Sequence, residues 1–201
     1  ESPEVAQFLK DNDEYIVVEA ARAINDDWSI EEALPALAEL LTQDQFKSEP
    51  LLRRSINAAL RVGGDKEMRN LIAFAKNPAF SNVLRGEALA ALGTWESPSV
   101  LDRVDGRLRG ELKRDGSQLR KELQQDISMF LSDSNPEILM GVAKTLENLG
   151  IQDNNDNVFA VFSKNKSPEV RAAMLSTLGK LKFSTTYFFV HKYLQSMSFL
   201  R

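Results

Sequence analysis

The sequence predicts an all-α protein built from stacked helical hairpins, and three observations support this prediction. Five segments of nine residues align without gaps, other amphipathic runs alternate with them, and no stretch alternates apolar and polar residues for long enough to form a β-strand. The aligned segments begin at Ile16, Leu52, Leu84, Ile138 and Val170. Helical hairpins that recur at this spacing and stack on their neighbours are typical of an α-solenoid.

The aligned segments share one apolar stripe. When the first residue of each is position zero, positions zero, four and eight are apolar throughout and position seven is small. Position four holds Ala20, Ile56, Ala88, Val142 and Met174, position seven holds Ala23, Ala59, Ala91, Thr145 and Thr177, and position eight holds Ile24, Leu60, Leu92, Leu146 and Leu178. Residues at this spacing lie on one helix face. We therefore expect the whole stripe, with Leu84, Ala88 and Leu92 in it, to be buried between neighbouring helices.

The runs between these segments supply the first helix of each hairpin, and their start signals agree with this assignment. The runs cover residues 29–41, 65–77, 119–131 and 156–164. Ser29 and Glu32 have the spacing of a capping box. The pairs Asn135-Pro136 and Ser167-Pro168 place a capping residue before a proline of the first turn. We count about five hairpins in a right-handed α-α superhelix, with a partial unit at the C-terminus.

One interval between the aligned segments is longer than the others. The successive spacings are 36, 32, 54 and 32 residues, so the third exceeds a 32-residue unit by 22 residues (54 minus 32). We assign the excess to an insertion at about residues 98–118. Trp95 precedes it, and an indole is too large an apolar surface to remain in water. We expect Trp95 to be buried and Gly106 and Gly110 to reverse the backbone.

Two interpretations of this insertion are open. In the first interpretation its role is structural. Ser97-Pro98 begins a short helix, and Asp102 either caps the following helix or, together with Arg103, ties the loop back through charge-assisted hydrogen bonds. In the second it is also a docking loop for a neighbouring domain, because long loops in compact domains are often functional. The candidate contact residues are Trp95, Asp102, Arg103, Arg107 and Arg109. The mixed charges from Arg103 to Glu122 are typical of a solvated helix face.

The motif "SPEVRAAMLSTLG" resembles HEAT repeats. Three further pieces, at residues 21–24, 53–58 and 95–106, resemble the HEAT segment of large bacterial membrane-bound dehydrogenase or haem-binding proteins. In those proteins a β-propeller precedes the HEAT region and a cytochrome c domain often follows. The resemblance covers roughly the first 110 residues. The sequence begins without Met and ends inside an apolar helical pattern, so we expect residues 1–201 to be a single HEAT-repeat domain excised from a larger protein. The resemblance implies that this parent is a periplasmic or extracellular redox protein. The CxxCH haem motif is absent, so the resemblance places no redox centre here.

Composition narrows the function classes. The net charge of −4 disfavours a nucleic-acid binder. With no cysteine and His191 as the one histidine, the common zinc sites and a Ser-His-Asp triad are disfavoured as well. We therefore expect a non-catalytic scaffold or protein–protein interaction module, with no cofactor, no metal and no membrane span. Its partner would be a neighbouring domain or another protein.

The position after the first residue of each aligned segment indicates where such a partner would bind. It holds Val17, Arg53, Arg85, Leu139 and Arg171, a mixed row that we place on the concave face of the solenoid. The alternative is a HEAT-like enzyme or nucleic-acid-binding module, similar to the alkylpurine DNA glycosylases or the bilin lyases. The sign of the potential on the concave face would discriminate between the two classes.

Overall fold

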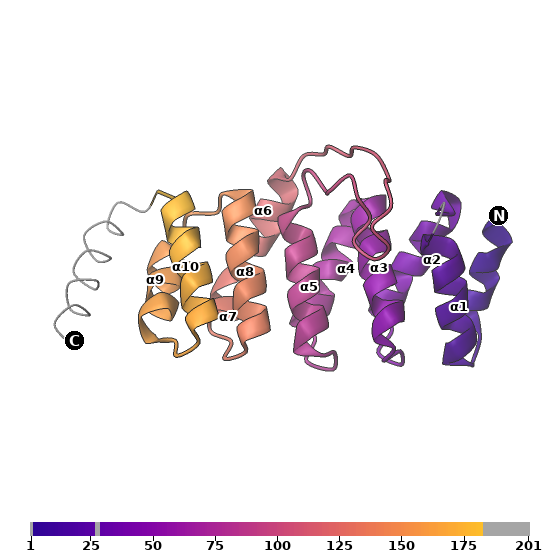
Figure 1. Cartoon of the computed structure of the whole chain (residues 1–201), viewed down its shortest axis with the longest axis horizontal. Helices are drawn as coiled ribbons and strands as arrows, with labels where there is room; N and C mark the ends of the chain where they lie inside the picture. The colour runs from indigo at the N-terminus through magenta and orange to yellow at the C-terminus, as the bar shows by residue number, and fades with distance from the viewer. Residues whose placement is uncertain (1, 27–28, 183–201) are drawn as a thin grey trace.

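The computed structural model describes residues 2–26 and 29–182, and its helices lie side by side along one long axis (Figure 1). All regular secondary structure in this part of the chain is helical, and its β structure is limited to an isolated bridge between Leu101 and Leu108. The prediction of an all-α fold is therefore confirmed. Within the described residues no helix is both long and apolar enough to cross a membrane.

The five aligned segments form the front row of helices in Figure 1. They are α1 (Glu14–Asn25), α3 (Glu49–Val62), α5 (Asn82–Gly93), α8 (Pro136–Leu149) and α10 (Pro168–Lys180). Each of these helices contacts the next one along the chain. The aligned segments are therefore neighbours in space, as the alignment predicts.

The remaining helices pack against this row. They are the 3-10 helix η1 (Pro3–Lys10), α2 (Leu34–Glu39) between the 3-10 turns η2 (Glu31–Ala33) and η3 (Leu40–Thr42), α4 (Asp65–Lys76), α6 (Ser117–Gln124), α7 (Ile127–Leu131) and α9 (Asn155–Lys164). Contacts pair η1 with α1, α2 with α3, α4 with α5, α7 with α8 and α9 with α10. The partial unit expected at the C-terminus lies outside the described residues.

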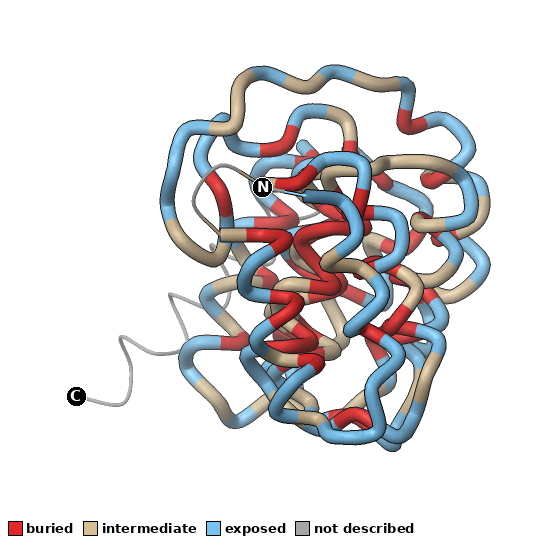
Figure 2. The backbone as a smooth tube through the Cα atoms, turned by 90° about the vertical axis from the view of Figure 1, so that its right-hand side faces the viewer, coloured by how far each residue is buried: buried red, intermediate tan, exposed pale blue. Residues whose placement is uncertain are grey.

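The apolar stripe is buried except at its first helix. Positions four and eight are buried in all five helices, and Leu84, Ala88 and Leu92 lie in the core as expected. Figure 2, viewed from the α1 end, shows that the buried residues lie through the interior of the stack. In α1, however, Ile16 and Ala23 are exposed, so the expectation is wrong at these two positions.

Ala23 is exposed because position seven of each aligned segment faces the preceding helix of the row. The Thr145 hydroxyl of α8 donates to the Leu89 carbonyl of α5 at 2.7 Å. The Thr177 hydroxyl of α10 donates in the same way to the Ala143 carbonyl of α8 at 3.2 Å. In the described part of the chain α1 has no row neighbour on that side, so the equivalent alanine, Ala23, stays exposed.

Helices α5 and α8 approach closely because glycines face each other. A Cβ atom at Gly141 would lie 2.8 Å from the Gly86 carbonyl oxygen, and one at Gly86 would lie 2.7 Å from the Glu137 carbonyl oxygen. Both distances are far inside van der Waals contact with backbone that has little freedom to move. The two glycines therefore set how tightly the middle of the stack packs.

Two of the three predicted helix starts are confirmed. The side chain of Asn135 accepts from the Glu137 N–H, and that of Ser167 accepts from the Val170 N–H. The capping box of Ser29 and Glu32 does not form. Ser29 has a left-handed backbone (φ 55°), and its N–H donates to the Asp26 carbonyl at 3.2 Å. This turn makes Ile30 the residue before η2, where no side chain caps the helix.

Candidate functional site

The insertion is an ordered loop, residues 94–116, that crosses one end of the front row and dips over α3 (Figure 1). Its middle is a small hairpin. The Asp102 N–H donates to the Arg107 carbonyl and the Arg109 N–H donates to the Val100 carbonyl, each at 2.8 Å. Gly106, with φ 75°, sits in the turn, as predicted. The short helix expected at Pro98 is absent: residues 97–100 form no helix and lead into the hairpin.

Asp102 lies at the centre of the loop and is 6% exposed. One carboxylate oxygen accepts the backbone N–H groups of Val104 at 2.8 Å and Asp105 at 3.2 Å. The other accepts from the Asn57 side chain at 2.8 Å and from Arg109 Nε at 3.1 Å. Asp102 therefore caps the hairpin turn and not the next helix. Burial raises its pKa, but these four hydrogen bonds together hold the pKa below its ordinary value.

Asn57 and Asn25 connect this carboxylate to the front row. Asn57 Nδ2 also donates to Asn25 Oδ1 at 2.8 Å, which joins α3 to the end of α1. Asn25 in turn donates to Asp26, whose carboxylate accepts two hydrogen bonds from Arg54 of α3, at 2.6 and 2.9 Å. A continuous chain of polar contacts thus runs from α1 through α3 into the loop.

Arg109, and not Arg103, is the guanidinium that ties the loop down. Its side chain is 10% exposed, and Nη2 donates to the Asn25 carbonyl at 2.6 Å and to Asp105 at 2.9 Å. Arg103 keeps an exposed surface, yet the protein atoms around its guanidinium lower its pKa by desolvation, while Glu87 opposes that effect and Arg53 adds to it. The expected tie by Asp102 is thus present, with its cationic partner six residues further along than predicted (109 minus 103). Residues 103–116 are not helical, so the charged helix face expected there begins only at α6.

A second anchor holds the loop around Trp95. Trp95 is 3% exposed, which confirms the expected burial. The Arg114 guanidinium lies 4.6 Å from the centre of the indole ring and donates to the Leu60 carbonyl at 2.7 Å. Burial lowers the pKa of Arg114, and nearby Arg61 lowers it further. The two anchors fix both halves of the loop on α3.

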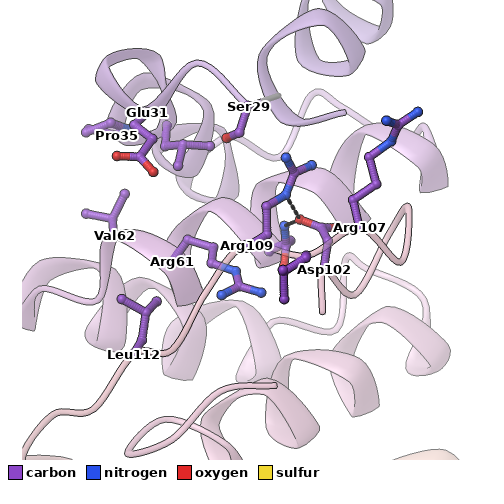
Figure 3. A pocket seen from close by; sticks show the side chains of 12 residues that line it. Ser29, Glu31, Pro35, Arg61, Val62, Asp102, Arg107, Arg109 and Leu112 are labelled. Carbon is purple, nitrogen blue, oxygen red and sulfur yellow. Dashed lines mark hydrogen bonds and ion pairs between the residues drawn. The ribbon is translucent and has the colours of Figure 1, made fainter. Parts of the chain in front are cut away.

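A pocket of about 670 Å³ lies between the loop and the residues of η2, α2 and α3 (Figure 3). It is lined by Ser29, Glu31, Leu34, Pro35, Asn57, Arg61, Val62, Asp102, Arg107, Leu108, Arg109 and Leu112. Arg61 Nη2 donates to the loop carbonyls of Ser99 at 3.0 Å and Leu101 at 3.2 Å. Burial lowers the pKa of Arg61, Asp102 opposes that effect and Arg109 adds to it.

The arginines expected on the concave face are occupied by contacts with their neighbours. Arg53 pairs with Glu49 and Glu87. Arg85 donates to the Ala75 carbonyl at 2.9 Å and to the Asn82 side chain at 2.7 Å. Arg171 lies over the Phe162 ring. Their row companions Val17 and Leu139 are buried. None of the three arginines lines the pocket, so the structure brings together Asp102, Arg107 and Arg109 but not this row.

The sequence interpretation missed the asparagines and the pocket. Asn25 and Asn57 directly follow the apolar stripe residues Ile24 and Ile56, and this position beside the stripe is the sequence signal for a buried polar network. Their partners lie up to 84 residues away, so no spacing rule identifies them. No described group of three His, Cys, Asp or Glu residues could hold a metal ion. His191 lies outside the described residues.

Neither a protein-family model nor a curated protein matches this chain. The resemblance to the HEAT segment of bacterial dehydrogenase-like proteins therefore stays a prediction.

Proposed function

We propose that this chain is a non-catalytic interaction module: a HEAT-like, right-handed solenoid that presents the loop at residues 94–116 to a protein partner. One observation carries the proposal. The loop is pinned by buried anchors, yet its outer edge exposes Val100, Leu101 and Leu108 by 39%, 49% and 73%.

These three apolar side chains belong to one small hairpin. Leu101 and Leu108 face each other across the bridge of the hairpin, and Val100 adjoins Leu101. Large aliphatic side chains held in fixed positions at a surface are typical of protein-binding sites. Because the loop is already ordered, binding would cost less conformational entropy than it would for a flexible loop.

The partner we propose is a neighbouring domain of the same parent protein. The resemblance described above supports this choice, since it implies a β-propeller before the helical region and a cytochrome c domain after it. The row of helices supplies a stiff base, and the loop supplies the contact surface. This assignment requires no chemistry from the chain itself.

Binding to the flanking domains of the full-length gene product tests the proposal. The domains are expressed separately and titrated calorimetrically with the wild-type chain, with Leu101→Asp and with Met129→Asp. Met129 is a matched control because it is exposed, apolar and located on α7. We expect Leu101→Asp to weaken binding at least tenfold and Met129→Asp to leave it unchanged. Equal affinities for all three chains, or no binding by the wild type, would refute the proposal.

A further inference from the structure

The wall of the pocket contains a cation with unused hydrogen-bond donors. Arg61 Nη2 is bound to two loop carbonyls, but Nε and Nη1 are buried and have no hydrogen-bond partner. Among the described residues no carboxylate forms an ion pair with Arg61, and nearby Asp102 is already bound by Arg109. A buried charged group without its full set of partners is costly. Arg61 is therefore suited to receive an anionic group from outside the chain.

Four residues earlier on the same helix face, Asn57 contributes an unused acceptor. Its Nδ2 donates to Asn25 Oδ1 and to Asp102 Oδ2, which fixes the orientation of the amide because a carboxylate can only accept. Both Nδ2 hydrogens are used, and Oδ1 is buried without a partner. Asn57 is 1% exposed and lines the pocket. Because Oδ1 is covered in the free chain, the pocket wall must shift locally before this acceptor can be reached from outside.

The other side of the pocket is apolar. In Figure 3 the Arg61 guanidinium lies between the Asp102–Arg109 pair and the side chains of Val62 and Leu112. Leu34 and Pro35 of α2 complete this surface. The volume of about 670 Å³ falls in the range of roughly 300–1,000 Å³ found for ligand sites. A bare inorganic anion would pair with Arg61 but leave the apolar surface unused.

We propose that this pocket binds an acidic peptide segment of a protein partner. A carboxylate of the segment pairs with Arg61, a backbone N–H donates to Asn57 Oδ1, and an adjacent apolar side chain packs on Val62 and Leu112. Because Nε and Nη1 are covered in the free chain, the Arg61 guanidinium turns toward the carboxylate on binding. The inference rests on the proposed function in taking a protein as the partner, and it specifies the chemistry of the contact.

Selection from a random heptapeptide display library tests this inference. The library is selected on the wild-type chain, and the best peptide is titrated against the wild type, Leu112→Glu and Lys113→Glu. Leu112→Glu places a carboxylate in the pocket without removing any hydrogen bond of the loop. Lys113→Glu is the matched control because it makes the larger charge change on an exposed neighbouring side chain. Circular dichroism and thermal melting confirm that both variants fold.

We expect enriched peptides that share an Asp or Glu next to an apolar residue. Replacing that acid by its amide, or introducing Leu112→Glu, should weaken binding at least tenfold, and Lys113→Glu should change it less than threefold. The Arg61 Nε NMR resonance should shift on binding. No enrichment, a consensus without acid, or equal binding to Leu112→Glu would overturn the inference.

The two proposals fail separately. If the flanking domains bind, lose affinity with Leu101→Asp and are indifferent to Leu112→Glu, the docking edge stands and the acidic-peptide pocket is wrong. If acidic peptides bind the pocket but the flanking domains do not bind the chain, the pocket stands and the assigned partner is wrong.

Discussion

Replacing Asp102 by asparagine tests whether the buried polar network holds the loop. All four groups that contact the carboxylate are donors: the N–H groups of Val104 and Asp105, the Asn57 amide and Arg109 Nε. Whichever way the new amide is turned, its NH₂ group faces donors on one side. The substitution is nearly isosteric, so it changes charge and hydrogen bonding while leaving the packing almost intact.

The expected cost follows from these contacts. Removing one partner of a buried ion pair costs about 3–5 kcal/mol, because the remaining charge is left buried. Arg109 keeps its bonds to Asp105 and to the Asn25 carbonyl, which reduces the loss. We therefore expect the lower end of that range, about 3 kcal/mol in the free energy of unfolding. For a chain of this size that corresponds to a fall of about 6–12 °C in Tm.

Chemical denaturation and hydrogen exchange measure this effect. The amides of Val104 and Asp105 should exchange much faster in Asp102→Asn, since their acceptor is weakened. Glu111→Gln is the control because Glu111 is exposed, and it should change stability by less than about 0.5 kcal/mol. A stability for Asp102→Asn within that same margin of the wild type would refute the view that the network holds the loop.

The same substitution predicts a change in acid stability. The folded pKa of Asp102 is lowered, so the group stabilises the native state above its unfolded pKa of about 3.9. That contribution disappears as the pH falls from about 5 through the folded pKa. Wild-type stability should therefore drop across this acidic range. The curve for Asp102→Asn should be flatter, and parallel curves for the two chains would contradict the assignment.

Three further substitutions test the packing. Leu92→Ala should cost about 2–5 kcal/mol, because Leu92 is fully buried in the stripe, and an unchanged denaturation midpoint would show that the stripe is wrongly assigned. Gly141→Ala should cost about 1–3 kcal/mol, because the new methyl group meets the Gly86 backbone. In the control, Gly179→Ala, the new methyl group meets no atom within 4 Å, so the substitution should be neutral or stabilising by up to about 1 kcal/mol. Equal changes in stability for Gly141→Ala and Gly179→Ala would refute the close approach of α5 and α8. Arg114→Met removes the cation over Trp95 and the hydrogen bond to the Leu60 carbonyl. The maximum of the tryptophan emission should therefore shift to longer wavelength. An unchanged emission spectrum would refute this second anchor.

Most of the fold could be predicted from the periodicity of apolar and small residues. The five gapless segments identify the front-row helices, because a helix that packs on two neighbours must repeat its small and apolar positions. The predicted burial of Ile16 and Ala23 is wrong for a reason that periodicity does not reveal. The pattern marks a face that fits a neighbour, while burial requires that the neighbour be present.

The site was less predictable than the fold. The 54-residue interval locates the insertion, and the size of Trp95 predicts its burial. Whether Arg103 or Arg109 pairs with Asp102 depends on the path of the hairpin. That path decides which side chains of the loop face α3. Local charge spacing suggested a helix here, and that expectation is wrong because the anchors to α1 and α3 determine the backbone of the loop.

These long-range anchors change how the stack responds to perturbation. Where each pair of stacked helices contacts only its nearest neighbours, stability is close to a sum of local terms. The insertion departs from that rule, since it follows α5 in the chain yet Arg109 reaches back to the Asn25 carbonyl at the end of α1. Asn57 of α3 contacts Asn25 and Asp102 with the same amide nitrogen, so one residue couples two helices and the loop. The pocket lies at this junction, so a ligand bound to Arg61 would act on contacts that hold α1, α3 and the loop together, and not on one hairpin alone.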